Sequence, residues 1–205
     1  MLRLCYFPTT IALAVHVALE EAGADYQLEL IDFREAGQRQ PAYLARNPKG
    51  RVPLLETPRG PLTETLAILA YVADTHPGAA LLPTEPFARA QALGVMTFLA
   101  STLHPNHAHK LRGARWSDDP AAQAAMKRKV PLNMTQGFQL IARDHLAGPW
   151  VLDSGFSVCD AYLFAIERWA EADGVDPADI PGNVAHRAAV AARPAVQRIL
   201  PLHAL

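Results

Sequence analysis

The sequence has few of the features that mark a protein for a special environment. Its 205 residues include only two cysteines, Cys5 and Cys159, which lie far apart and predict neither a disulfide framework nor a zinc site. The net charge of −1 gives no electrostatic footprint for nucleic acid or an anionic membrane. No signal-peptide pattern follows Met1, and no apolar stretch reaches the roughly 18 residues of a spanning helix. We therefore expect a soluble, cytoplasmic protein with neither a nucleic-acid nor a membrane partner.

Half of the residues are apolar, which is enough to build a sizeable core. Over the first 79 residues, strand-like and helical patterns alternate. The predicted strands are 2–7, 26–31, 52–57 and a very short one around 61–62. The predicted helices are 11–22, a short irregular one within 34–46, and one from Thr63 to about residue 76. The predicted order is therefore β-α-β-α-β-β-α.

The character of the sequence changes after a proline-containing connector at residues 82–86. Alanine-rich helical patterns fill the remainder, and no strand is predicted there. The expected helices are 86–116, 119–146, 157–172, 181–192 and 194–201. The sequence thus predicts an α/β domain over residues 1–79, followed by an all-helical domain over residues 86–205.

The dipeptide Val52-Pro53 opens the third predicted strand. A proline at a strand start donates no hydrogen bond, so it suits an edge or a bend. At a bend, the backbone N–H and C=O of Val52 could pair with an extended peptide ligand. Taken alone, however, the dipeptide favours an ordinary edge proline.

A second candidate feature follows eleven positions later, at Glu64-Thr65. The N-terminus of a helix presents unpaired N–H groups that bind a carboxylate, and the Thr65 hydroxyl adds a donor. Glu64 can pair with an ammonium group, so the two residues fit the α-amino-acid end of a γ-glutamyl group. The alternative is that Thr63 caps the helix and Glu64 only complements its dipole. The spacing from Val52-Pro53 favours the ligand site.

Several segments, in this order, resemble the bacterial glutathione S-transferases, nearest their beta class. The segments are His16 with 19–23, 47–53, 62–64 with 67–68, 71–74, 103–104, 160–164 and 192–197. The resemblance covers nearly the whole chain. It implies a thioredoxin-like N-terminal domain, a helical C-terminal domain that contributes the electrophile site, and a homodimer. It also implies detoxification, with glutathione as co-substrate, no further cofactor, and a hydrophobic electrophile as second substrate.

The resemblance implies that Val52, Pro53, Glu64 and Thr65 bind glutathione. Arg51 stands where the family has a polar side chain, and it could meet the glycine carboxylate of glutathione. Its alternative role is that of a solvated loop cation.

The chain departs from the beta class at Ile11, which occupies the position of the class's active-site cysteine. Cys5 and Cys159 are expected to be buried hydrophobic residues instead. Other branches of the family place a serine in this loop, and Thr10 matches it best. The Thr10 hydroxyl could donate to the glutathione sulfur and lower its pKa, or it could only cap the first helix. Tyr6, at the end of the first strand, is the rival, as in several animal classes.

His104 matches an active-site histidine of the beta class, and it could hydrogen-bond the sulfur or the cysteinyl backbone. His107 and His109 follow it, but their spacing does not put all three on one helical face, so no metal is expected. Asp160 belongs to a capping box with Ser157, a structural motif rather than a site.

The resulting hypothesis is a glutathione transferase that stabilises the thiolate of glutathione and adds it to an electrophilic carbon. One alternative is a glutathione-dependent isomerase or peroxidase on the same scaffold. The loop rich in serine and cysteine that is typical of zeta-type isomerases is absent, which disfavours that isomerase. The other alternative is a non-catalytic glutathione-binding or protein-interaction member of the superfamily, which Ile11 favours and Glu64-Thr65 oppose.

Overall fold

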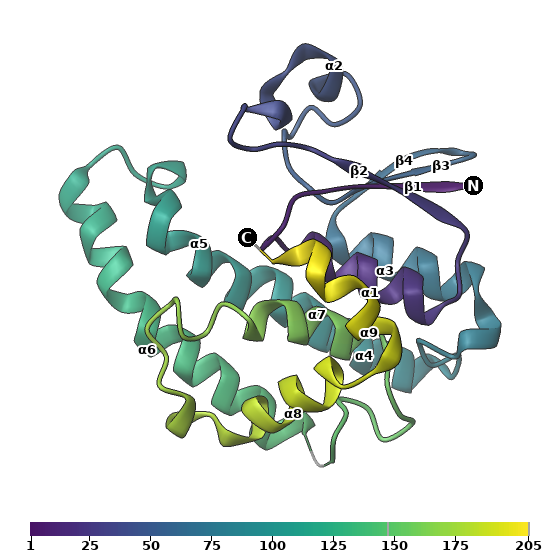
Figure 1. Ribbon diagram of the computed structural model, residues 1–205. Helices are drawn as coiled ribbons and strands as arrows, with labels where there is room; N and C mark the ends of the chain where they lie inside the picture. Colours follow the sequence, from purple (N-terminus) through teal and green to yellow (C-terminus); the bar gives the residue numbers. More distant parts are fainter. Residues whose placement is uncertain (147, 205) are drawn as a thin grey trace. The chain divides into compact units, whose positions relative to one another are not determined.

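The computed structural model describes residues 1–146 and 148–204 (Figure 1). The contacts group the chain into two compact units. The first unit contains Met1–Arg89 and the segment from Ala191 onward, and the second contains Ala90–Val190. The division into domains at residues 79–86 stays a prediction. The two compact units divide between Arg89 and Ala90, a few residues after the predicted division. The C-terminal segment belongs to the first unit.

A four-stranded sheet forms the first unit's centre (Figure 1). Its strands are β1 (Leu2–Tyr6), β2 (Tyr26–Leu30), β3 (Leu54–Thr57) and β4 (Gly60–Thr63), in the order β2-β1-β3-β4. β1 and β2 are parallel, whereas β3 is antiparallel to both β1 and β4. Cys5 pairs with Leu54, and Leu54 pairs with Thr63. The end of β1, the start of β3 and the end of β4 therefore meet at one end of the sheet.

The helices of the first unit cover the sheet unequally. α1 (Ala12–Glu21) and α3 (Thr65–Thr75) pack together, and Figure 1 shows both on one side of the sheet. α9 (Pro194–Ile199) packs on α1, and a 3-10 turn over Leu200–His203 follows it. α2 (Pro41–Leu44), preceded by a 3-10 turn over Gly37–Arg39, lies on the opposite side (Figure 1).

The second unit is helical. α5 (His104–Arg112), α6 (Pro120–His145) and α7 (Val158–Glu167) lie within it, while α4 (Pro86–Phe98) and α8 (Pro181–Ala191) cross its borders. A π-helical segment, Leu99–Leu103, joins α4 to α5. The remaining 3-10 turns are Pro77–Ala79, Gly113–Arg115 and Pro177–Asp179.

The predicted fold class is confirmed, since the element order is β-α-β-α-β-β-α followed by helices. The predicted capping box is also confirmed: Ser157 and Asp160 cap α7 reciprocally. In the part of the chain that the structure describes, no helix combines the length and the apolarity that crossing a bilayer requires.

Several predicted boundaries in the first unit are wrong. β3 begins at Leu54 rather than at residue 52, because proline has no N–H to donate to the ladder at position 53. The helix predicted from Thr63 begins at Thr65, because β4 extends through Thr63 to pair with Leu54. The short, irregular helix predicted within 34–46 is present as Pro41–Leu44, preceded by the 3-10 turn Gly37–Arg39.

The helix predicted over 86–116 is interrupted in the second unit. Pro105 has no backbone N–H, so it cannot donate a hydrogen bond to the carbonyl one turn earlier in a continuous helix. The π-helical segment Leu99–Leu103 lies at that turn. The helix predicted over 157–172 ends at Glu167, and turns continue from there to Gly174.

Candidate functional site

The loop that leads into β3 is held from inside by buried polar contacts. The Asn47 side chain, which is 1% exposed, donates to the carbonyl of Arg51 at 2.7 Å, and the Tyr43 hydroxyl donates to the same carbonyl at 2.6 Å. Gly50 has a φ of +59°, and a Cβ there would meet the Gln38 carbonyl oxygen at 2.9 Å. These contacts fix the backbone just before Val52. The Val52–Pro53 peptide bond is cis.

Arg46, which lies two residues after the end of α2, connects that helix to the sheet. Its guanidinium donates to both carboxylate oxygens of Glu29 at 2.7 Å and to Glu56 at 2.8 Å. It also lies 2.9 Å from the Cys5 sulfur. Hydrogen bonds to Glu29 hold the pKa of Arg46 above its ordinary value, and the same bonds hold the pKa of Glu29 below its own. The sheet therefore positions α2, and α2 positions the loop.

The start of α3 is the second part of the candidate site. Glu64 precedes the helix with a φ of 71°, a left-handed conformation that is uncommon for a non-glycine residue and is typical of functional positions. Its exposed carboxylate pairs with the ammonium of Lys49, which also donates to Thr63 at 2.8 Å. The first backbone bond of the turn runs from Ile68 to Glu64 at 3.0 Å. The N–H groups before Ile68 therefore have no acceptor inside the helix.

Thr65 is 7% exposed, and its hydroxyl makes no hydrogen bond to any residue within 1–146 or 148–204. Because Leu54 pairs with Thr63, this hydroxyl lies at the end of the sheet where Val52 and Pro53 enter β3. Four of the predicted glutathione residues, Val52, Pro53, Glu64 and Thr65, thus meet at one place. Their roles stay predictions.

The loop between β1 and α1 lies at the same end of the sheet, since β1 ends opposite the start of β3. The Thr10 hydroxyl donates to the Phe7 carbonyl at 2.6 Å and accepts a long bond from the Ala12 N–H at 3.4 Å. Thr10 therefore closes the loop at the N-terminus of α1. Thr9 has a φ of 61°, a strained conformation for a β-branched side chain. To donate to a sulfur, Thr10 would have to release Phe7.

Tyr6 is 8% exposed, and its ring packs against the rings of His16 and His203, with centroids 6.2 and 5.3 Å away. This environment is that of a core aromatic residue. The geometry consequently favours Thr10 and the backbone N–H groups at the start of α1 over Tyr6.

The cysteines are poorly suited to thiol chemistry. Burial raises the pKa of Cys5 to about 12, and the neighbouring Glu29 adds to this rise. Burial likewise raises the pKa of Cys159 to about 12. Both side chains are 0% exposed, as expected for small hydrophobic residues.

His104 begins α5 in the second unit, and its ring lies 5.3 Å from that of Trp169. Sequence reasoning did not predict the partner of the neighbouring His107, whose Nδ1 lies 2.7 Å from Asp173 Oδ2. The two residues are 66 positions apart, and no local pattern links them. His109 packs edge-on against Trp116 at 4.4 Å. The histidine run therefore divides between two environments.

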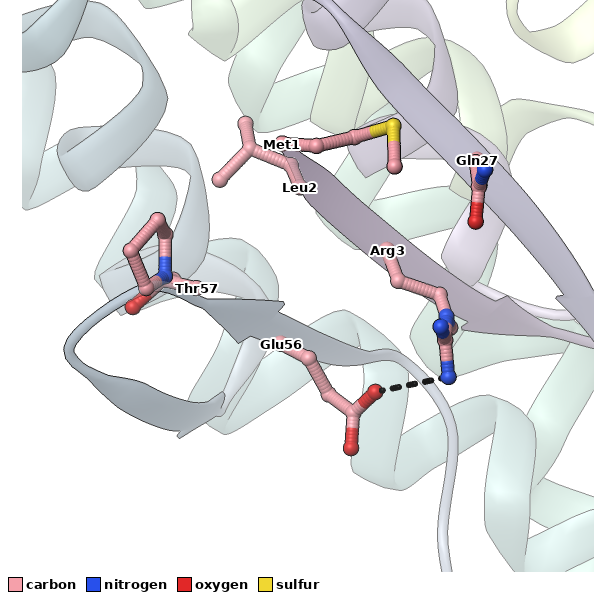
Figure 2. A pocket seen from close by; sticks show the side chains of 7 residues that line it. Met1, Leu2, Arg3, Gln27, Glu56 and Thr57 are labelled. Atoms are coloured by element: carbon pink, nitrogen blue, oxygen red, sulfur yellow. Dashed lines mark ion pairs between the residues drawn. The ribbon is translucent and has the colours of Figure 1, made fainter.

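Arg51 is exposed, and its guanidinium pairs with no acid among the described residues. A hollow of about 140 Å³ lies at the opposite end of the sheet, where Arg3 pairs with Glu56 (Figure 2). It is lined by Met1, Leu2, Arg3, Gln27, Glu56, Thr57 and Pro58. None of the predicted site residues lines this hollow, so it is separate from the candidate site.

Comparisons with known proteins agree with this geometry. The family model of the glutathione S-transferase N-terminal domain matches residues 3–74. Glutathione S-transferase GstA of Escherichia coli O157:H7 is 30% identical over 202 residues, which cover 97% of each sequence. Maleylacetoacetate isomerase of Pseudomonas aeruginosa is 33% identical over 178 residues, 82% of each sequence.

Solved structures extend the likeness to the whole chain. A glutathione transferase homologue from Sulfitobacter, solved with bound glutathione, has a TM-score of 0.95 and 43% identity. The match covers 100% of this chain and 99% of the other. On these grounds, the chain belongs to the glutathione S-transferase family.

Proposed function

We propose that this chain binds glutathione and adds its thiolate to an electrophilic small molecule. The observation that carries the proposal is the start of α3, where the unpaired hydroxyl of the largely buried Thr65 and the first helical N–H groups lie beside the Val52-Pro53 loop. The bound glutathione in the Sulfitobacter homologue, which is 43% identical, supports the same ligand here.

Each part of glutathione is bound by different residues. The γ-glutamyl carboxylate accepts hydrogen bonds from Thr65 and from the first N–H groups of α3. Glu64 exchanges Lys49 for the ammonium group of the ligand, because its carboxylate is exposed. The backbone of Val52 pairs with the cysteinyl part, and Arg51 reaches the glycine carboxylate.

Calorimetric titration with glutathione tests the proposal. The wild-type protein should bind, and Thr65→Val should weaken binding about tenfold or more, because it removes one hydrogen bond to a charged group without changing shape. Thr75→Val is the matched control: its hydroxyl bonds to Tyr71 at the far end of α3, at 2.7 Å. Absence of binding by the wild-type protein would refute the function, and equal affinities would refute the role of Thr65.

The thiolate is tested separately, by following the ultraviolet absorbance of the bound sulfur against pH. The free thiol has a pKa of about 8.5, and the complex should ionise at lower pH. Thr10→Val should leave the affinity for glutathione within about twofold, but it should slow turnover about tenfold, as expected for loss of one donor to a developing anion. A fully active Thr10→Val variant would show that backbone N–H groups or Tyr6, and not Thr10, stabilise the thiolate. An unshifted thiol in the wild-type complex would favour a non-catalytic binding protein.

A glutathione-dependent isomerase is the second candidate, because a maleylacetoacetate isomerase is 33% identical to this chain. The two functions differ in their use of glutathione. A transferase consumes one free thiol per turnover, whereas an isomerase returns it, so counting thiols during turnover separates them. The homodimer, the hydrophobic electrophile and the cytoplasmic location also stay predictions.

A further inference from the structure

Lys49 and Glu64 form an ion pair within the first unit, at the place predicted for the ammonium group of glutathione. The Lys49 ammonium bonds to Glu64 Oε1 and donates to the Thr63 hydroxyl at 2.8 Å. Lys49 lies in the loop before β3, and its two partners lie where β4 passes into α3, so the contact joins segments 14 and 15 positions apart. Within residues 1–146 and 148–204, no other group bonds to the Glu64 carboxylate.

The loop holds the backbone of Lys49 in place. The buried Asn47 side chain accepts a hydrogen bond from the Lys49 N–H at 3.2 Å and donates to the Arg51 carbonyl at 2.7 Å. The Asn47 carbonyl also accepts from the Gly50 N–H at 2.9 Å. Bonds on both sides of Lys49 therefore fix the point from which its side chain reaches Glu64, so the ion pair is a feature of this loop.

The ammonium group of the ligand would meet Glu64 in the same way. In a γ-glutamyl group, the ammonium and the carboxylate are attached to one carbon. If the carboxylate accepts from Thr65 and the first N–H groups of α3, the ammonium lies beside Glu64, which directly precedes that helix. The Lys49 side chain ends in the same chemical group, a cation with three N–H donors and no acceptor. Lys49 thus already supplies Glu64 with the partner that the ligand offers.

We propose that Lys49 competes with the ammonium group of glutathione for Glu64, so that the ligand binds by exchange of one ammonium for another. The inference rests on the proposed function and adds to it a residue that limits affinity. Two ammonium groups on one carboxylate would place like charges side by side, so one leaves as the other arrives. The gain from the new ion pair is then partly offset by the loss of the old one.

The competition is modest in size and acts on release. The Lys49 and Glu64 side chains are 45% and 64% exposed, and an ion pair in such a position changes an equilibrium by about fivefold at most. Differences in affinity of this kind lie mostly in the rate of dissociation. Because a glutathione conjugate keeps the γ-glutamyl end, Lys49 speeds the release of product as well as of glutathione.

Calorimetric titration of Lys49→Met with glutathione tests the inference by the sign of the effect. Glutathione carries a net negative charge at neutral pH, so the loss of a nearby cation would ordinarily weaken its binding. Exchange predicts the reverse, an affinity about three- to fivefold higher than that of the wild-type protein. Arg59→Met is the matched control. It removes an exposed cation from the turn between β3 and β4, at the opposite end of the sheet, and should change the affinity less than about twofold.

A second ligand separates exchange from simple obstruction. In glutaryl-cysteinylglycine, a hydrogen atom replaces the α-amino group of glutathione, so this analogue brings no ammonium to Glu64. Lys49→Met should not tighten its binding, whereas a lysine that only obstructed the site would hinder both ligands alike. Equal tightening with the two ligands would overturn the inference.

Thr63→Val tests the same exchange through the other contact of Lys49. It removes the hydroxyl that holds the ammonium, and valine is equally suited to a strand, so the variant should bind glutathione about twofold tighter. Lys49→Met together with Thr63→Val should bind no tighter than Lys49→Met alone, because Thr63 acts only through Lys49. An additive gain in the double variant would contradict the exchange.

The wild-type titration distinguishes failure of this inference from failure of the proposed function. If the wild-type protein binds glutathione and Lys49→Met binds it equally well or more weakly, the inference is overturned and the proposed function stands. If neither protein binds glutathione, both are refuted.

Discussion

Asp160→Asn is expected to destabilise the second unit by about 3–5 kcal/mol, the range for removing one partner of a buried ion pair. The side chain is 0% exposed and accepts four hydrogen bonds. Three come from the Val151 N–H, the Ser157 N–H and the Ser157 hydroxyl, each at 2.7 Å, and the fourth comes from His186 Nε2 at 3.1 Å. In the asparagine variant, an NH₂ group replaces one carboxylate oxygen, so a donor would face the N–H and O–H donors that now bond to Asp160.

The loss of charge adds to the loss of geometry. Burial opposes protonation of His186, but hydrogen bonds to Asp160 and Glu167 outweigh it and raise the pKa of His186 to about 9. The imidazole is therefore charged at neutral pH. Without the Asp160 carboxylate, this buried cation keeps only Glu167, whose own pKa burial raises. One substitution thus disturbs both the cap of α7 and the α7–α8 ion cluster.

Urea denaturation followed by tryptophan fluorescence measures this effect, because Trp116, Trp150 and Trp169 all belong to the second unit. Asp119→Asn is the matched control: Asp119 caps α6 at an exposed position, and asparagine caps a helix equally well, so the change should stay under about 0.5 kcal/mol. A loss below about 1 kcal/mol in Asp160→Asn would contradict the argument. If that variant does not fold, Ser157→Ala should still show a loss of about 1–2 kcal/mol.

The order of elements was predictable because it depends on local patterns. Alternating and helical spacings gave all four strands of the sheet and the helices that pack on it. The capping box at Ser157 is also local, so it too was found. Boundaries failed where a tertiary contact overrides a local preference. Thr63 pairs with Leu54 and so ends a strand, although its sequence is typical of a helix start.

The candidate site was only partly predictable. Val52, Glu64 and Thr65 lie in recognisable segments, and the β3–β4 pairing brings them together. The contacts that position these residues could not be predicted from the sequence. Arg46 lies in a polar stretch with no evident role, and its hydrogen bonds to Glu29 and Glu56 form only because the segment after α2 packs against β2 and β3.

The same limit applies to buried histidines. A histidine on an apolar helix face is typical of a core residue, and the sequence around His16 indicates only a family segment. Its partners are Tyr26 on β2 and His203 near the C-terminus, 187 positions away. The contact with His203 follows from the packing of the C-terminal segment on α1, which spacing along the sequence does not encode.

The stability of the first unit is expected to fall by about 3 kcal/mol between neutral pH and pH 4 because of His16 alone. Its side chain is 0% exposed, and burial lowers its pKa from 6.5 to about 4, although Glu20 acts in the opposite direction. The unfolded chain therefore binds a proton between pH 6.5 and 4 that the folded chain refuses. The contribution is complete above pH 6.5 and is lost as pH falls towards 4.

The hydrogen bonds around His16 explain why it resists protonation. The Tyr26 hydroxyl donates to Glu20 at 2.5 Å, so it accepts from His16 Nε2 at 2.8 Å. His16 Nδ1 then accepts from His203 Nε2 at 2.8 Å. If His16 Nδ1 gained a proton, its N–H would face the N–H of His203 Nε2, and no water could separate the two donors because both side chains are buried.

Comparison of the wild-type protein with His16→Gln isolates this contribution, since all other titrating groups are common to both. Hydrogen exchange of the α1 amides reports on the first unit, which contains no tryptophan. Between pH 7.5 and 5, the wild-type protein should lose about 2 kcal/mol more than the variant, because the proton uptake is confined to the unfolded state. His16→Gln itself should be less stable than the wild-type protein at pH 7.5, because glutamine reaches only one of the two partners. Parallel pH curves for the two proteins would show that His16 titrates alike in both states, and the buried chain from His203 to Glu20 would then have no part in acid stability.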